Sequence, residues 1–119
     1  MLWKKEVRVW DKNINKLYKT TSLAITEKNG VIMAWTGLLD CEGKKVFEHD
    51  IVEGIGLGVV EWSIYEIFSK GEGYPTWVAK KKGRSGYVLI CDKNFQIREK
   101  VVGNIYENPE LFETVRNGR

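Results

Sequence analysis

Histidine, cysteine and proline are scarce in this chain of 119 residues. It holds one histidine, His49, two cysteines, Cys41 and Cys91, and two prolines. A serine or cysteine nucleophile normally needs a histidine as its base, so one histidine argues against most hydrolase designs. Two cysteines far apart in the sequence cannot make a disulfide scaffold, and they lack the paired spacing of a zinc site. We therefore expect no catalytic residue, no metal site and no cofactor.

Long apolar runs and a strong charge imbalance are also missing. No stretch approaches the roughly 20 apolar residues of a membrane helix, and the N-terminus lacks the apolar segment of a secretory signal. We expect a cytoplasmic protein without membrane contact, in which both thiols stay reduced. Lys plus Arg number 19 and Asp plus Glu 16, which gives a net charge of +3. That small excess does not by itself indicate a nucleic-acid partner.

Short strand-like segments separated by turns make up most of the chain. Val7 to Trp10 alternates β-branched and aromatic residues, and Asn29-Gly30 is a strong hairpin signal between the runs 17–26 and 31–35. Turns then recur every 8 to 12 residues (a spacing typical of a small barrel or sandwich). Further strand-like runs lie at 46–47, 50–52, 57–62, 76–79, 87–91 and 96–102.

One helix is predicted, at the C-terminal end. Asn108 is a good N-cap, and Pro109 suits the first helical position, where no N–H is needed. The helix is too short to be stable alone, so it should pack on the sheet. Residues from about 44 to 106 would suffice for a small barrel of about five or six strands, with residues 1–36 as a β-rich arm.

A basic segment with neighbouring aromatic residues is the main candidate for partner binding. Single-stranded nucleic-acid binders combine cations for phosphates with rings for base stacking. A solvated hairpin turn with core aromatics on its flanking strands, or a contact to an acidic protein, would give the same pattern. The residues concerned are Tyr74, Trp77, Lys80, Lys81, Lys82, Arg84 and Tyr87.

Three segments together resemble the YopX-like family of phage and prophage proteins. They are Val7 to Lys12, Trp35 to Val52 and Val101 to Leu111. The middle segment is the most specific, and it reads Trp-Thr-Gly-Leu-Leu-Asp-Cys-Glu-Gly-Lys-Lys-Val-Phe-Glu-His-Asp-Ile-Val. The resemblance implies a mainly β protein, in which a β-rich N-terminal hairpin arm (1–36) precedes an SH3-type small barrel with a short C-terminal helix (37–119). It also implies a phage or prophage gene expressed inside a bacterium.

The residues that carry this resemblance suit structural roles. Glycines supply turn conformations, and Asp or Asn side chains can bond the backbone N–H groups of a turn. His49 stands where the family has glycine, which suggests that this turn tolerates a side chain. The motif positions are Trp10, Asp11, Thr36, Gly37, Leu38, Asp40, Gly43, Asp50, Ile51, Val52, Gly103, Asn104, Tyr106 and Pro109.

These observations favour a non-enzymatic phage or prophage accessory protein that binds a host or phage protein. Small barrels present strand edges and aromatic loop residues to such partners. Nucleic-acid binding through Lys80 to Arg84 is the alternative, and a small hydrolase or nuclease is a third hypothesis. We also expect a homo-oligomer, because an N-terminal arm with Trp3 and Trp10 exposes strand edges and aromatic surface.

Overall fold

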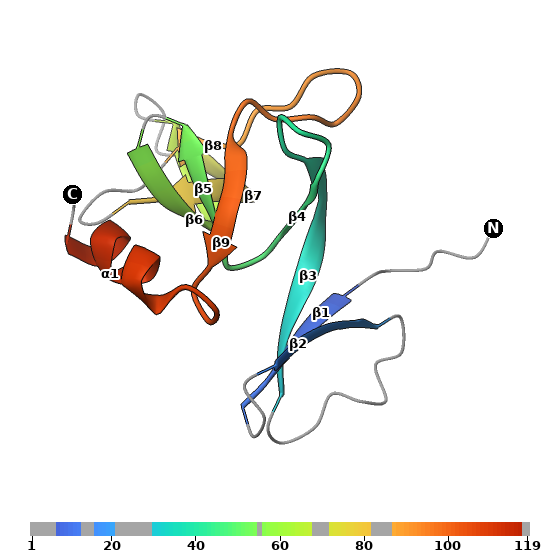
Figure 1. The fold of residues 1–119 in the computed structure, drawn as a ribbon. Helices are drawn as coiled ribbons and strands as arrows, with labels where there is room; N and C mark the ends of the chain where they lie inside the picture. Colours follow the sequence, from blue (N-terminus) through green and yellow to red (C-terminus); the bar gives the residue numbers. More distant parts are fainter. Residues whose placement is uncertain are drawn as a thin grey trace.

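The computed structural model describes residues 7–12, 16–20, 30–54, 56–67, 72–81 and 87–117, without the side chains of 18–20, 64–67, 72–74 and 117. This part of the chain is mostly β with one short C-terminal helix, which confirms the predicted fold class (Figure 1). The elements are β1 (Val7–Asp11), β2 (Lys16–Thr20), β3 (Gly30–Leu39), β4 (Lys45–Phe47), β5 (Asp50–Gly54), β6 (Gly56–Ile67), β7 (Glu72–Lys80), β8 (Tyr87–Val88), β9 (Lys100–Asn104) and α1 (Pro109–Asn117).

The N-terminal strands form an antiparallel sheet in the order β2-β1-β3-β4. The hairpin signal at Asn29-Gly30 predicts that the run 17–26 pairs with the strand after Gly30, and residues 21–29 of that hairpin lie outside the described residues. In the described part β2 does not neighbour β3: both strands pair with β1, and Val9 lies opposite Ile32. The buried side chains explain the order. Val7, Val9 and Met33 are 4%, 0% and 0% exposed. A strand rich in buried residues gains most from a neighbour on each side, so β1 takes the inner position.

Strand β3 connects the arm to the barrel (Figure 1). Its first half, Gly30 to Ala34, pairs with β1, and its second half pairs with β4 through Trp35 and Leu39. The register shifts between those two pairs, close to Gly37, which has φ +84°. One strand therefore belongs to both parts of the molecule and sets their relative position.

The barrel strands form a five-stranded antiparallel sheet in the order β8-β7-β6-β5-β9. Alternation along β5 directs Val52 into one apolar cluster and Ile51 into another. The first cluster is the barrel core, built around Val46, Val52, Val60, Ala79, Leu89, Ile97 and Val101. The second lies beneath α1, where Ile51, Val59 and Val115 are buried and Leu111 and Phe112 pack against them partly buried.

Helix α1 begins where the sequence predicts. The carbonyl of Asn108 accepts hydrogen bonds from the N–H groups of Leu111 and Phe112, and Pro109 is the first helical residue. The Asn108 side chain turns back to β9, where its Oδ1 accepts the N–H of Asn104 at 3.1 Å. A Cβ on Gly103 would collide with this side chain, so a larger residue there would displace Asn108 from its hydrogen bond to Asn104. No helix among the described residues is long and apolar enough to cross a membrane.

Candidate functional site

A buried ion pair joins the arm to the barrel. Asp50 is the first residue of β5, and its Oδ1 accepts a hydrogen bond from Nη2 of Arg8, on β1, at 2.5 Å. The two side chains are 8% and 0% exposed. The other carboxylate oxygen, Oδ2, accepts the N–H of Phe47 at 2.8 Å, and the Arg8 guanidinium lies 4.7 Å from the centre of the Phe47 ring. Arg8, Phe47 and Asp50 thus form one desolvated contact.

The protonation of Asp50 is set by opposing effects. Burial raises the pKa of this carboxyl, while the charge of Arg8 and the hydrogen bonds from Phe47 and Arg8 act in the opposite direction. Moving both ions out of water costs nearly as much free energy as their mutual attraction supplies. A buried ion pair therefore adds little stability compared with an apolar contact in the same place. Loss of one partner is much more costly, because it leaves a single charge buried.

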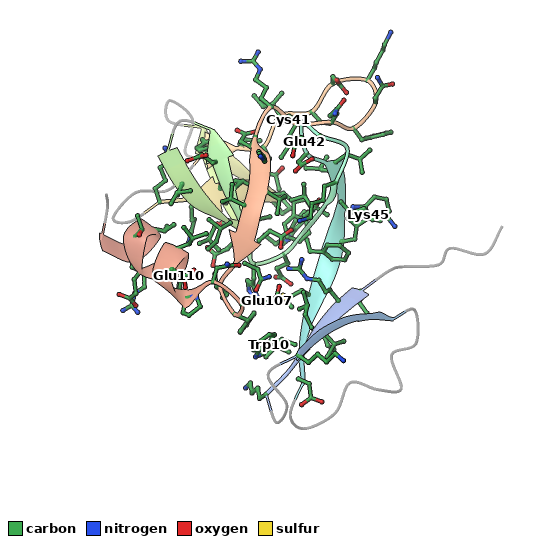
Figure 2. The ribbon with its side chains drawn as sticks, in the orientation of Figure 1. Trp10, Cys41, Glu42, Lys45, Glu107 and Glu110 are labelled. Carbon is green, nitrogen blue, oxygen red and sulfur yellow. The ribbon has the colours of Figure 1, made fainter. Side chains whose placement is uncertain are left out.

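Three rings form a second contact at the same junction. Trp10 of β1 stacks on Tyr106, with ring centres 5.6 Å apart and planes inclined by 19°. His49 meets Tyr106 edge-on, at 5.8 Å and 62°. Burial, helped by the negative charge of Glu48, raises the pKa of the Tyr106 phenol. Segments from the beginning, middle and end of the sequence therefore meet here, as Figure 2 shows for Trp10 below the barrel.

His49 adopts a backbone conformation that glycine prefers. Its φ is +70°, in the left-handed region, at the position where the resemblance places a glycine. Its ring lies against Tyr106, with Nδ1 3.5 Å from the phenol oxygen. The turn tolerates the side chain because the ring contact offsets part of the backbone strain.

Asp40 organises the turn after β3. It is fully buried, and its carboxylate accepts the N–H groups of Glu42 at 2.9 Å, Lys44 at 2.8 Å and Val101 at 3.0 Å. Burial acts to raise the pKa of Asp40, but these three donors and the charge of Lys44 outweigh it and hold the pKa below its usual value. Since Val101 lies on β9, one carboxylate holds together parts of the barrel that are distant in sequence.

The other motif residues also shape turns and strand ends. Asn104 Oδ1 accepts the N–H groups of Tyr106 and Glu107, and its amide donates to Glu107 Oε1. Thr36 Oγ1 donates to the carbonyl of Val46 and accepts the N–H of Leu38, which ties β3 to β4. Gly43 has φ +83° with open space around it, so its backbone conformation is what requires glycine.

The basic and aromatic residues predicted to bind a partner are divided between surfaces. Trp77 packs against the barrel core, on the same face of β7 as Ala79. Lys80 lies on the opposite face and pairs with Glu61, with Nζ 3.7 Å from Oε2. Lys82, Arg84 and the side chain of Tyr74 lie outside the described residues. Among the described members of this set, Trp77 and Tyr87 therefore pack with the barrel core, and Lys80 lies on the opposite face of β7.

Tyr87 and Lys81 form a local pair beside the barrel core. Lys81 Nζ lies 5.4 Å from the centre of the Tyr87 ring. The Tyr87 hydroxyl is buried beside the side chain of Glu99. Burial, together with the nearby carboxylate of Glu99, raises the pKa of this phenol to about 12. The Tyr87 ring thus packs against the barrel core and is not part of an open stacking surface.

Trp62 is an exposed aromatic residue that the sequence reasoning missed. It lies directly opposite Trp77 on the β6-β7 hairpin, with ring centres 5.1 Å apart and planes at 69°, and 55% of it is exposed. Alternation along 57–62 predicts a core-facing Trp62, because it shares a face with Val60. β5, however, pairs with β6 only as far as Val59, so the hairpin extends past the closed part of the barrel and leaves Trp62 uncovered.

The scarce metal and thiol ligands do not assemble a centre in the described part of the chain. No group of three or more His, Cys, Asp or Glu side chains that could hold a metal ion occurs among the described residues. Cys41 and Cys91 are free thiols that line one hollow of about 360 Å³.

Comparison with known proteins decides the family. The model of the YopX protein family matches residues 4–113. The chain belongs to the YopX family. This YopX protein is also similar to a solved structure, protein EF1440 from Enterococcus faecalis, with 21% identity and a TM-score of 0.47. That alignment covers 90% of the YopX chain and 96% of the other chain. No curated protein matches this chain.

Proposed function

We propose that this YopX protein is a non-enzymatic binding module whose partner is a host or phage protein. The family resemblance leads us to place it in the cytoplasm of a bacterium that carries the phage or prophage. The observation that carries the proposal is the aromatic pair of Trp62 and Trp77 on the β6-β7 hairpin.

The pair has the properties of an interface anchor. Trp62 exposes 55% of its surface, and its ring meets that of Trp77 edge-on. Tryptophan is among the residues that contribute most to protein–protein binding energy. A ring that is already fixed loses less conformational entropy on binding than a mobile one. A protein partner with an apolar pocket fits this arrangement.

Nucleic-acid binding is the competing function. It would use Lys80 to Arg84, with bases stacked on the neighbouring rings. Glu61 partly neutralises Lys80, and Trp77 faces the other side of β7. Both features weaken a continuous track for a phosphate backbone, so we favour the protein partner.

Capture from a bacterial lysate tests the proposal with paired baits. We expect the wild-type bait to capture one or more proteins that the Trp62→Ala bait does not retain. Phe95→Ala is the matched control, because Phe95 exposes 63% of its surface on a separate loop. With the captured partner purified, Trp62→Ala should weaken Kd by about 30-fold, the loss typical of an interface hot spot.

Two results would contradict the proposal. One is equal retention of every captured protein by the wild-type and Trp62→Ala baits. The other is tight binding of a mixed-sequence oligonucleotide at low salt that Lys80→Glu abolishes, which would assign the function to nucleic acid.

A further inference from the structure

The outer edge of β6 beside Trp62 has no neighbouring strand among the described residues. The last hydrogen bond on that side is donated by the N–H of His49 to the carbonyl of Val60, at 2.8 Å. β5 pairs only with the first part of β6, whereas β6 continues along β7 as far as Ile67. The backbone of residues 62–66 therefore has a strand on one side only.

Backbone alternation shows which residues face this open edge. In an antiparallel ladder, successive residues direct their N–H and C=O groups to opposite sides of the strand. The carbonyl of Val60 points away from β7, because it accepts the N–H of His49. The pairing with β7 continues without a register shift, so the backbone groups of Trp62, Ile64 and Glu66 also point away from β7. Each of these residues offers one N–H donor and one C=O acceptor at the edge.

The other edge of the hairpin is protected. Trp77, which lies opposite Trp62, directs its carbonyl away from β6 to the N–H of Leu89, at 3.1 Å. By the same alternation the nitrogen of Pro75 lies on this outer side of β7, and proline has no N–H to offer an added strand. Natural sheets protect free edges with proline, lysine or a bulge. Residues 61–67 of β6 hold neither proline nor lysine and pair without a bulge, so this edge is open to pairing.

The open edge and the exposed aromatic ring meet at Trp62. Its ring lies on the face of the hairpin that carries Trp77, and 55% of the residue is exposed. A strand added at the edge would place every second side chain on the same face as that ring. One extended segment can therefore use both features, with main-chain hydrogen bonds for affinity and an apolar side chain on the ring for specificity.

We propose that an extended segment of a protein partner adds to this edge as a further strand beside β6. Its backbone bonds the N–H and C=O groups of Trp62, Ile64 and Glu66, and one of its apolar side chains covers the Trp62 ring. The inference rests on the proposed function and specifies how the partner binds. A second copy of this chain fits less well, because a two-fold pair centred on Ile64 would set Glu66 of one chain opposite Trp62 of the other.

Amide hydrogen exchange of the full chain, with and without a peptide, tests this inference. The probe is a peptide selected on the wild-type chain from a displayed library of random sequences. In the free chain we expect the N–H groups of Trp62, Ile64 and Glu66 to exchange faster than those of Ser63 and Tyr65, which β7 protects. The bound peptide should slow exchange at the first three residues and leave the other two unchanged.

Variants at position 64 separate backbone pairing from side-chain contact. Ile64→Pro removes one outward N–H and none of the hydrogen bonds to β7, so we expect it to weaken peptide binding about tenfold. Ile64→Ala keeps this N–H and is the matched control, which should bind clearly more tightly than Ile64→Pro. If Ile64→Pro does not fold, N-methylation of the peptide makes the same test: methyl groups on one alternate set of its residues should abolish binding, and methyl groups on the other set should be tolerated.

Strand addition is overturned if no peptide is selected, or if a bound peptide leaves the exchange of these three N–H groups unchanged. Binding that Trp62→Ala loses and Ile64→Pro keeps would also overturn it, while the proposed function would stand on side-chain contacts alone. Protection that rises with the concentration of the chain, without any peptide, would assign the edge to a second copy. Peptide binding that Trp62→Ala leaves unchanged would instead contradict the proposed function itself.

Discussion

Removal of Asp50 is expected to be the most damaging single change at the junction. In Asp50→Ala the guanidinium of Arg8 stays in a site where its side chain is 8% exposed, without the carboxylate that balances its charge. The N–H of Phe47 also loses its acceptor at 2.8 Å. The variant therefore leaves a buried cation and a buried donor unpaired.

The magnitude follows from those two losses. Breaking a buried ion pair by removing one partner costs about 3–5 kcal/mol of unfolding free energy. A domain of this size has a total of about 5–15 kcal/mol, so the variant keeps only part of its stability. At about 4 °C per kcal/mol, the melting temperature should fall by about 12–20 °C. Replacing both partners by apolar side chains should cost much less, since no charge is then buried.

A double-mutant cycle measures this coupling. Urea unfolding, followed by circular dichroism at pH 7, gives the unfolding free energies of wild type, Arg8→Met, Asp50→Ala and the double variant. We expect each single variant to lose several kcal/mol and the double variant to lose at least about 2 kcal/mol less than the sum of the two. Additive losses, or a loss below about 1 kcal/mol for Asp50→Ala, would refute the assignment of Arg8 and Asp50 as the contact that holds the arm.

Three further predictions use the same unfolding assay or a simple hydrodynamic one. Because its folded pKa is lowered, Asp40 stabilises the protein fully above its unfolded pKa of about 3.9 and loses this contribution as the pH falls towards the lower folded value. Asp40→Asn should therefore flatten the decline in unfolding free energy below about pH 5, and an unchanged slope would count against the three N–H contacts. Gly43→Ala, at φ +83°, should cost about 1 kcal/mol, whereas Phe95→Gly, at φ +60°, should gain about 0.5 kcal/mol, and the opposite signs would disprove the strain argument. In sedimentation at micromolar concentration we expect a species larger than the 13.7 kDa monomer, and a monomer alone would exclude self-association under those conditions.

Local patterns predicted much of the fold. Alternation located most strands, and Asn108-Pro109 located the start of α1, because strand faces and helix ends depend on adjacent residues. The predicted runs 87–91 and 96–102 were too long or displaced, since the strands there are Tyr87–Val88 and Lys100–Asn104. The position of β3 beside β1 was not predictable from the hairpin signal at Asn29-Gly30. The choice of neighbour depends on which strand buries both faces, and this is a property of the whole sheet.

The junction and the aromatic pair depend on contacts that no local pattern encodes. Arg8 and Asp50 are 42 residues apart, and nothing in the local sequence of either indicates the other as its partner. The motif resemblance singled out Trp10 and Tyr106 but gave no indication that their rings stack. Trp62 was missed because strand alternation does not show how far the β6-β7 hairpin extends beyond the barrel.

Photo-crosslinking from position 62 tests the central claim most directly. The photoreactive residue benzoylphenylalanine replaces Trp62 in one chain and Phe95 in a control chain, and both are irradiated in the bacterial cell. Our account predicts a discrete adduct with another protein from position 62 and a much weaker one, or none, from position 95. A nuclease-sensitive adduct, or equal protein adducts from the two positions, would contradict a protein-binding surface at Trp62.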